Sequence, residues 1–373
     1  MMMSEFDDIR PYNDAEVPVV LRRVVADKEL RMAMISMLAP RFKTRWSWLL
    51  SPLIGVALRI QFLGVKTVDG FQRRLEGYLG RIIRRSSAEY TVSGLDKLDP
   101  NKPYLFVSNH RDIVMDPAFV NWALYQNGFK TIRIAIGDNL LSKPFVSDLM
   151  RLNKSFIVQR SVAGRREKLM AAKKLSAYIH HSIVQEQANI WIAQREGRAK
   201  DGVDKTNSAV IGMFSLSKPK DRSYADYVKE LNIVPVAISY EYDPCDVMKA
   251  RERYYQLEKG GYRKARNEDV RSIAQGITGW KGRVHLAFGD VLDGDYQNDA
   301  EVAVAIDAQI HRKYRLFETN ETAHRWLNEC PDDEGPHWVP EKLRERVRAL
   351  PNDVRPYLLA QYANAVESQQ NAS

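Results

Sequence analysis

Cysteine is scarce in this chain of 373 residues, which contains only Cys245 and Cys330. Two cysteines so far apart supply neither a disulfide framework nor the ligand spacing of a zinc site. The adjacent His180 and His181 lack accompanying cysteines or carboxylates, so we interpret them as surface or packing residues of a helix. We therefore expect no metal and no cofactor, and a reducing cytoplasm fits the composition best.

Long hydrophobic runs are also absent. The best candidate, residues 46–58, contains Ser51 and Pro52 and ends at Arg59, before the roughly 18 to 20 residues that a membrane-spanning helix needs. The first residues have neither the basic flank nor the apolar stretch of a secretory signal, so we expect them to stay on the chain. We therefore expect a cytoplasmic protein that associates peripherally with the inner face of the membrane.

Positive charge exceeds negative charge, with a formal net charge of +9 and a sequence pI of about 9.3. Such a balance favours an anionic partner without naming it. Zinc-finger spacing, a single-strand-binding signature and a sustained basic helix are all missing, so we do not expect nucleic acid to be that partner.

The basic residues gather instead on either side of the apolar run, at 41–45, 73–74 and 81–85. Trp46 and Trp48 can enter a lipid headgroup layer while the arginines are attracted to anionic lipid, at about 1 kcal/mol per basic residue. We therefore expect residues 1–88 to form amphipathic helices at an anionic membrane surface. The alternative is that the run is a core helix packed on a sheet.

Short apolar segments alternate with longer helical stretches from residue 89 onward, which is typical of an α/β domain with a mostly parallel central sheet flanked by helices. We expect a catalytic domain over residues 89–295 and a helical C-terminal extension over 296–373. The ends, residues 1–14 and 369–373, lack an apolar pattern and are expected to fray. The predicted strands are 104–107, 131–136, 155–158, 189–193, 233–239 and 284–288, and the clearest predicted helices are 116–125, 165–187, 301–327 and 340–366.

The best candidates for catalysis lie in residues 108–117, Ser-Asn-His-Arg-Asp-Ile-Val-Met-Asp-Pro, directly after the first of these strands. An imidazole oriented by a carboxylate can remove a proton from a hydroxyl that attacks an acyl carbon. Asp112 and Asp116 both compete to orient His110. Positions six apart point to opposite sides of a regular helix, so Asp116 can serve only if the helix begins irregularly or the turn bulges. The other aspartate would cap the helix.

Three further blocks follow in order: Phe-Ile-Val-Gln-Arg at 156–160, Arg-Glu-Gly-Arg at 195–198, and Ile-Val-Pro-Val-Ala-Ile at 233–238. The third block should emerge at the carboxyl end of a strand, where open α/β sheets build their sites. There Gly197 permits close backbone approach and Arg198 supplies a cation suited to phosphate. The alternative is a plain polar turn.

Together the four blocks resemble the glycerolipid acyltransferase family over roughly residues 90–291. They are most similar to its glycerol-3-phosphate and 1-acylglycerol-3-phosphate acyltransferase branch, because Arg111 directly follows the histidine and the third block continues Arg-Ala-Lys-Asp-Gly. The first motif departs from the family, in which four residues separate His and Asp, whereas five separate His110 from Asp116. The resemblance favours Asp116, because Pro117 and an apolar run follow it.

The resemblance implies an O-acyltransferase without a covalent acyl-enzyme, and no G-x-S-x-G elbow occurs. His110 and Asp116 would be catalytic, acting on a hydroxyl of glycerol-3-phosphate or a lysophospholipid, with acyl-CoA or acyl carrier protein as donor. The implied substrate-binding residues are Arg111, Arg160, Glu196, Gly197, Arg198 and Pro235. Two alternatives are an acyl thioester hydrolase and a non-catalytic membrane-surface binding protein.

Overall fold

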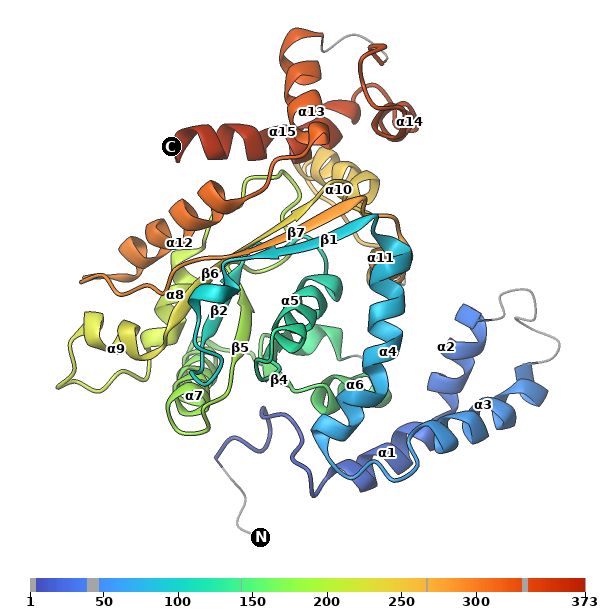
Figure 1. Ribbon diagram of the computed structural model, residues 1–373, viewed down its shortest axis with the longest axis vertical. Coiled ribbons are helices and arrows are strands. Elements are labelled where there is room, and N and C mark those ends of the chain that lie inside the picture. Colours follow the sequence, from blue (N-terminus) through green and yellow to red (C-terminus); the bar gives the residue numbers. More distant parts are fainter. Residues whose placement is uncertain (1–4, 39–46, 142, 266–267, 331–334, 373) are drawn as a thin grey trace. The chain divides into compact units, whose positions relative to one another are not determined.

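The computed structural model describes residues 5–38, 47–141, 143–265, 268–330 and 335–372 (Figure 1). The chain forms two compact units, one of residues 1–79 and 132–178 and the other of residues 80–131 and 179–373. The second unit contains three of the four sequence blocks, and the first unit contains the block at 156–160. The division into segments 1–88, 89–295 and 296–373 remains a prediction.

All six predicted strands are present, with bounds within two residues of the prediction. An additional strand, β1 (Glu89–Ser93), precedes them; its Glu-Tyr-Thr-Val-Ser sequence is mostly polar and gave no apolar segment to detect. The others are β2 (Leu105–Ser108), β3 (Arg133–Gly137), β4 (Ser155–Val158), β5 (Ile190–Ala193), β6 (Ile233–Tyr240) and β7 (Arg283–Phe288).

The sheet of the second unit has the strand order β1-β7-β6-β2-β5. β2 is parallel to both β5 and β6, β1 is parallel to β7, and β6 and β7 are antiparallel. In the first unit β3 and β4 form another parallel pair. All eight residues of β6 are buried, as expected for a central strand covered on both faces. The fold is therefore the predicted α/β class with mostly parallel strands.

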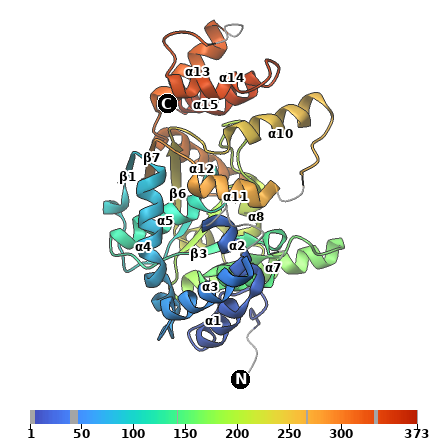
Figure 2. The ribbon, with the colours of Figure 1, turned by 90° about the vertical axis from the view of Figure 1, so that its right-hand side faces the viewer.

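The helices of the second unit flank this sheet and continue beyond it. Figure 2 shows α13, α14 and α15 together as one group near the C-terminus, with α10 beside them. The helices are α5 (Met115–Gln126), α8 (Ser208–Ser215), α9 (Tyr224–Glu230), α10 (Asp246–Glu258), α11 (Glu268–Thr278), α12 (Asp299–Lys313), α13 (Glu318–Glu329), α14 (Glu341–Arg348) and α15 (Arg355–Asn371). α4 (Val68–Ser86) and α7 (Arg165–Val184) each begin in the first unit and end in the second.

The prediction that both ends fray is wrong for the described residues. Ile9 is 2% exposed, and its carbonyl accepts a hydrogen bond from the Ile157 backbone N–H at 2.9 Å. At the other end, α15 continues to Asn371, and the Gln369 side chain donates to the Tyr314 carbonyl at 2.7 Å. A single buried isoleucine and a single side-chain amide contact produce no periodic apolar pattern in the sequence. The order of the two ends could therefore not be predicted from it.

The first unit contains α1 (Val17–Ala26), α2 (Lys28–Leu38), α3 (Ser47–Gln61) and α6 (Pro144–Leu152). One hydrophobic cluster of this unit contains Val17, Val20, Leu21, Val24, Val65, Val68, Phe71 and Leu152. No helix in the described part of the chain is long and apolar enough to cross a membrane.

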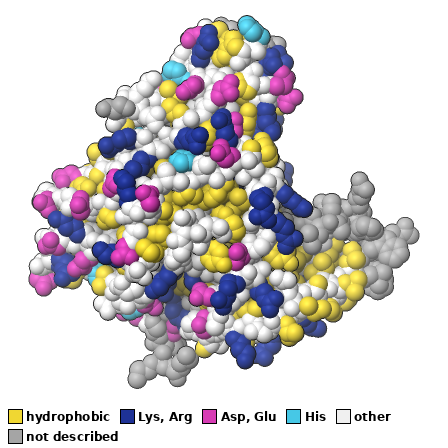
Figure 3. All heavy atoms as spheres, viewed as in Figure 1, with side chains coloured by type: hydrophobic (Ala, Val, Ile, Leu, Met, Phe, Trp, Pro, Cys, Tyr) yellow, Lys and Arg dark blue, Asp and Glu magenta, His cyan; other side chains and the backbone are white. Residues whose placement is uncertain are grey.

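The outer face of α3 carries exposed apolar side chains, which we call the α3 stripe: Leu53 (65% exposed), Val56 (49%), Ile60 (67%) and Leu63 (74%), the last just after the helix. The spacing of three and four residues places Leu53, Val56 and Ile60 on one helical face, and Leu63 follows in the turn after α3. Figure 3 shows hydrophobic side chains gathered in this region. Residues 41–45 and Trp46, expected to flank such a surface, lie outside the described residues, as does the Trp48 side chain.

Candidate functional site

The first and third sequence blocks meet at one end of the second unit's sheet. Ser108, the last residue of β2, lies opposite Ala193 of β5 and Val236 of β6. Just beyond, the His110 carbonyl accepts a hydrogen bond from the Ala199 backbone N–H at 2.8 Å. Parallel strands that end together thus bring residues 110–112 beside the turn that follows β5, as the sequence predicted.

Asp116 is the aspartate that contacts the histidine ring. His110 Nδ1 lies 2.8 Å from Asp116 Oδ2; the histidine side chain is 13% exposed and the aspartate side chain is fully buried. The six-residue separation works because α5 begins only at Met115, so residues 111–114 form a turn that carries Asp116 back to the ring.

Three further donors determine the direction of that hydrogen bond. Asp116 Oδ2 also accepts from the backbone N–H groups of Arg111 (2.6 Å) and Asp112 (2.9 Å), and Oδ1 accepts from the Tyr240 hydroxyl at 2.7 Å. Backbone N–H groups can only donate, so the carboxylate acts as the acceptor for this whole group of donors. His110 then carries its hydrogen on Nδ1, which leaves the Nε2 lone pair available to take a proton.

Tyr240 supports this arrangement from β6. Burial, followed by the charge of Asp116, raises the pKa of the Tyr240 hydroxyl well above its ordinary value of 10. The phenol therefore stays protonated and keeps donating to Asp116. Tyr240 lies one residue beyond the strand predicted at 233–239, and the sequence analysis assigned it no role.

Asp112 has the capping role that was its alternative. Its Oδ1 accepts from the backbone N–H groups of Val114 (2.9 Å) and Met115 (2.8 Å), where α5 begins. Burial and the nearby Asp116 raise the pKa of this carboxyl. α11 packs closely on it, because a Cβ placed on Gly276 would lie 1.9 Å from Asp112 Oδ2.

Trp191 of β5 is a site neighbour that the sequence analysis missed. Its ring meets the His110 ring edge to face with centroids 5.7 Å apart, and its Nε1–H donates to Ser108 Oγ at 3.0 Å. The signal was available: β5 precedes the Arg-Glu-Gly-Arg block, and Trp is the one aromatic residue in that strand.

Arg111, predicted to contact the acceptor, is a buried residue of the His110 loop. The residue is 5% exposed, and its Nη2 donates to Asp204 Oδ2 at 2.7 Å. The Asn109 side chain donates to the same oxygen at 3.0 Å. The guanidinium therefore forms an internal ion pair beside the His110 loop, and its contact with the acceptor's phosphate remains a prediction.

The remaining residues of the third block lie in the turn after β5. Arg198 is half-buried, and its Nη1 donates to Ser272 Oγ of α11 at 2.6 Å. Gly197 has a φ of +74°, which a side chain would strain, and Glu196 is exposed. Arg198 directly precedes Ala199, whose backbone N–H donates to the His110 carbonyl.

The second block belongs to the first unit, and the fourth block forms β6 beside β2 in the second unit. Arg160 belongs to the first unit, where it is exposed and its guanidinium lies against Gly137: a Cβ there would be 3.2 Å from Arg160 Nε. Its approach to His110 remains a prediction. Pro235 is buried in β6 opposite Val107, and its carbonyl accepts from the Gly289 N–H at 2.7 Å.

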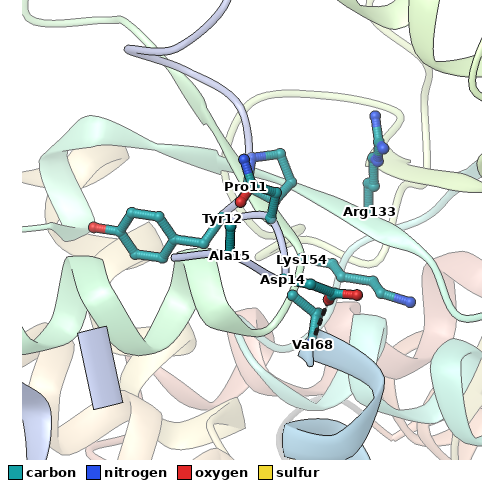
Figure 4. A pocket seen from close by; sticks show the side chains of 8 residues that line it. Pro11, Tyr12, Asp14, Ala15, Val68, Arg133 and Lys154 are labelled. Carbon is teal, nitrogen blue, oxygen red and sulfur yellow. Dashed lines mark hydrogen bonds between the residues drawn. The ribbon is translucent and has the colours of Figure 1, made fainter. Parts of the chain in front are cut away.

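A pocket of the first unit involves none of the predicted site residues (Figure 4). Its two basic side chains already have partners: Lys154 Nζ donates to Asp69 at 2.8 Å, and Arg133 donates to the Tyr178 hydroxyl at 3.1 Å. It is lined by Pro11, Tyr12, Asn13, Asp14, Ala15, Val68, Arg133 and Lys154. We assign it no role.

Comparison with known proteins decides the family. The family model described as "Acyltransferase" matches residues 89–239, which contain all four blocks. This segment belongs to the acyltransferase family. The site around His110 is therefore that of an acyltransferase segment, bounded by β1 and β6.

Other comparisons add less. The chain is similar to a solved structure, the 1-acyl-sn-glycerophosphate (LPA) acyltransferase PlsC from Thermotoga maritima, at 16% identity and a TM-score of 0.38, over 79% of this chain and 93% of that one. No curated protein sequence matches the chain.

Proposed function

We propose that this acyltransferase moves a fatty acyl group from acyl-CoA or acyl carrier protein to a hydroxyl of glycerol-3-phosphate or of a lysophospholipid such as 1-acylglycerol-3-phosphate. The observation that carries the proposal is the hydrogen bond between His110 Nδ1 and Asp116 Oδ2 at 2.8 Å. It orients a partly exposed imidazole with Nε2 as the proton acceptor.

The reaction needs one proton shuttle. Nε2 of His110 takes the hydroxyl proton while the oxygen forms a bond to the thioester carbonyl carbon. When the tetrahedral intermediate collapses, the C–S bond breaks and the departing thiolate takes the proton back from Nε2. Asp116 stabilises the imidazolium between these two steps, and Tyr240 and the loop N–H groups hold Asp116 in place.

The acceptor's phosphate would be bound by arginine, whose planar fork donates paired, charge-assisted hydrogen bonds. Arg198 is the better supported ligand, because it belongs to the turn that hydrogen-bonds the His110 carbonyl. Arg160 would contribute from the first unit. Arg111 acts indirectly, by anchoring the loop to Asp204.

The direct test is acyl transfer by the purified protein. Radiolabelled acyl-CoA or acyl carrier protein is incubated with glycerol-3-phosphate, lysophosphatidic acid or another lysolipid, and ester product and released thiol are both measured. Wild type should form ester with at least one acceptor. His110→Ala should lower kcat by about 10²- to 10⁴-fold, the usual contribution of a general base.

Other outcomes would contradict the proposal. Thiol release that is independent of any acceptor would instead indicate a thioester hydrolase. Lipid binding without thiol release, in wild type and His110→Ala alike, would indicate a non-catalytic membrane-binding protein.

We also propose that the first unit docks peripherally on an anionic membrane through the α3 stripe. The stripe offers apolar side chains to the interface, and Arg59 on α3 and Arg73 and Arg74 on α4 are exposed and basic. Arg74 lies near the stripe, because its Nη2 donates to the Leu63 carbonyl at 3.4 Å. Apolar burial combined with attraction to anionic lipid gives reversible binding.

A further inference from the structure

A buried lysine outside the acyltransferase segment contacts the His110 loop. Lys249 projects from α10, and its side chain is 2% exposed. Its Nζ donates to the Arg111 carbonyl at 2.7 Å and to Asp243 Oδ2 at 2.5 Å. A buried ammonium is costly unless it is paired, and here the carboxylate supplies the charge while the carbonyl of the residue after His110 accepts a second bond.

The C-terminal helices hold the partner of this lysine. The Asp243 N–H donates to the Tyr362 hydroxyl of α15 at 3.0 Å, and its carbonyl accepts from Arg346 of α14 at 3.0 Å. Burial alone would raise the pKa of the Asp243 carboxyl, but Lys249, the Cys245 N–H and Arg111 together lower that pKa. Asp243 therefore remains a charged partner, held through both its backbone N–H and its backbone carbonyl.

Tyr362 and Arg346 are in turn joined through Asp246 at the start of α10. Asp246 Oδ2 accepts from the Tyr362 hydroxyl at 2.6 Å and from Arg346 Nη1 at 2.7 Å, and Asp246 is 1% exposed. A continuous polar chain thus runs from α14 and α15 through Asp243 and Lys249 to the backbone beside the histidine. The helices that supply it share a core containing Trp326, Leu343, Val347, Leu350, Leu358 and Leu359.

The bond from Lys249 completes the restraint on a short loop. The His110 carbonyl is held by Ala199, and the N–H groups of Arg111 and Asp112 are held by Asp116. These three bonds come from residues within 89–239. The Arg111 carbonyl is held instead by Lys249, which lies beyond that segment.

We propose that Lys249 is a positioning residue for His110, and that the C-terminal helices α14 and α15 exist in part to hold it there. The inference rests on the proposed function, because the rate that it protects is the proton transfer at His110. Displacing a catalytic group by about 1 Å can lower the rate about a hundredfold, so restraining the loop that carries His110 favours catalysis. A C-terminal region that only stabilises the fold would make different predictions.

The first test compares two tyrosines of α15. Tyr362→Phe removes the hydroxyl that bonds Asp243 and Asp246, whereas Tyr357→Phe removes one that bonds Glu258 at the surface. Hydrogen exchange of peptides covering residues 108–118 is measured alongside steady-state kinetics. Tyr362→Phe should speed exchange in these peptides and lower kcat about three- to tenfold, with the acceptor KM within twofold. Tyr357→Phe should change neither.

The second test removes the bond to the loop itself. Lys249→Met alone would leave Asp243 buried without its cation and could unfold the protein, so it is combined with Asp243→Asn, which removes both charges. The double variant should keep a cooperative unfolding transition and lose at least tenfold in kcat. Leu343→Ala, which weakens the C-terminal core without touching the polar chain, should lower the melting temperature and leave kcat within twofold.

Several results would overturn the inference. One is a folded double variant with wild-type kcat and unchanged exchange over residues 108–118. Another is a loss that lies entirely in the acceptor KM, which would make Lys249 a binding residue. A third is an equal loss of kcat in Leu343→Ala, which would reduce the network to general stability. If the wild-type protein transfers no acyl group but hydrogen exchange over residues 108–118 still responds to Tyr362→Phe, the proposed function is wrong. The contact of Lys249 with the loop would still be supported.

Discussion

Asp116 is surrounded by donors, which makes it sensitive to a change of a single atom. In Asp116→Asn the amide N–H₂ faces either His110 Nδ1 and the two backbone N–H groups, which all bond one oxygen of Asp116, or the Tyr240 hydroxyl. The first arrangement forces the hydrogen of His110 onto Nε2 and removes the proton acceptor, and a wrong tautomer of this kind lowers kcat by about 10⁴-fold in the serine protease triad. The second arrangement keeps the tautomer but removes the negative charge that stabilises the imidazolium. We expect Asp116→Asn to lose about 10²- to 10⁴-fold in kcat in the acyl-transfer assay.

Asp112→Asn is the matched control, because it makes the same chemical change at a carboxylate that caps α5. Asn keeps the oxygen that accepts from Val114 and Met115, so the helix cap survives. Its kcat should stay within about fivefold of wild type, since a cap exchanged between Asp and Asn changes little. A larger loss in Asp112→Asn than in Asp116→Asn would show that the wrong carboxylate has been assigned to the ring.

For single residues, the sequence predicted their chemical roles better than the contacts that surround them. The strand-like run before residue 108 placed His110 just beyond the carboxyl end of a strand. The choice between Asp112 and Asp116 depended on a turn whose shape follows from tertiary contacts. The ion pair of Arg111 could not be predicted, because its partner Asp204 is 93 residues away along the chain. Burial of an arginine is decided by such a distant carboxylate and leaves no local signal.

At the scale of secondary-structure elements, the sequence predicted the apolar strands and helices but not the points at which a helix is interrupted. The expected helix at 301–327 is two helices, because Phe317 begins α13 with its N–H bonded to the Asn320 side chain. The expected helix at 340–366 is also two, α14 and α15, separated by Pro351, which cannot donate a backbone hydrogen bond inside a helix. Apolar periodicity continued across both breaks and concealed them.

The α3 stripe gives the prediction that belongs to this scale. Ile60→Gln/Leu63→Gln replaces two exposed apolar side chains and should leave folding unchanged, because surface substitutions usually alter stability by about 0.5 kcal/mol or less. Burying each side chain fully would be worth about 1.5–3 kcal/mol, so partial insertion of both supports a loss of about 2 kcal/mol, or about thirtyfold in affinity. Co-sedimentation with phosphatidylglycerol-containing vesicles measures it.

Val19→Gln provides the control for that experiment, because Val19 is an apolar side chain of α1 with 54% exposure that lies outside the stripe. It should bind vesicles as wild type does. Raising the salt concentration should weaken binding of all three proteins, since the arginine contribution is screened. Equal vesicle binding by wild type and the double variant would rule out the stripe as the docking surface.

Across the whole molecule, buried charge couples stability to pH. Lys281 has no exposed surface, and its Nζ donates to the Gly279 carbonyl at 3.0 Å. Burial lowers the pKa of this lysine from 10.5 to about 8, although Asp112 and Asp243 favour its charged form. The folded chain therefore releases this proton more easily than the unfolded chain does.

The sign of the effect follows from that difference. Between about pH 8 and pH 10.5 the unfolded state binds more protons at Lys281, so the free energy of unfolding should rise with pH, by about 3 kcal/mol in total from this group. Lys281→Met should remove the rise, which urea titrations at intervals of half a pH unit would measure as a difference from wild type. Lys102→Met, at an exposed position, should keep the wild-type slope. Parallel slopes for wild type and Lys281→Met would mean that the buried ammonium keeps its proton through this range, held by the carboxylates of Asp112 and Asp243.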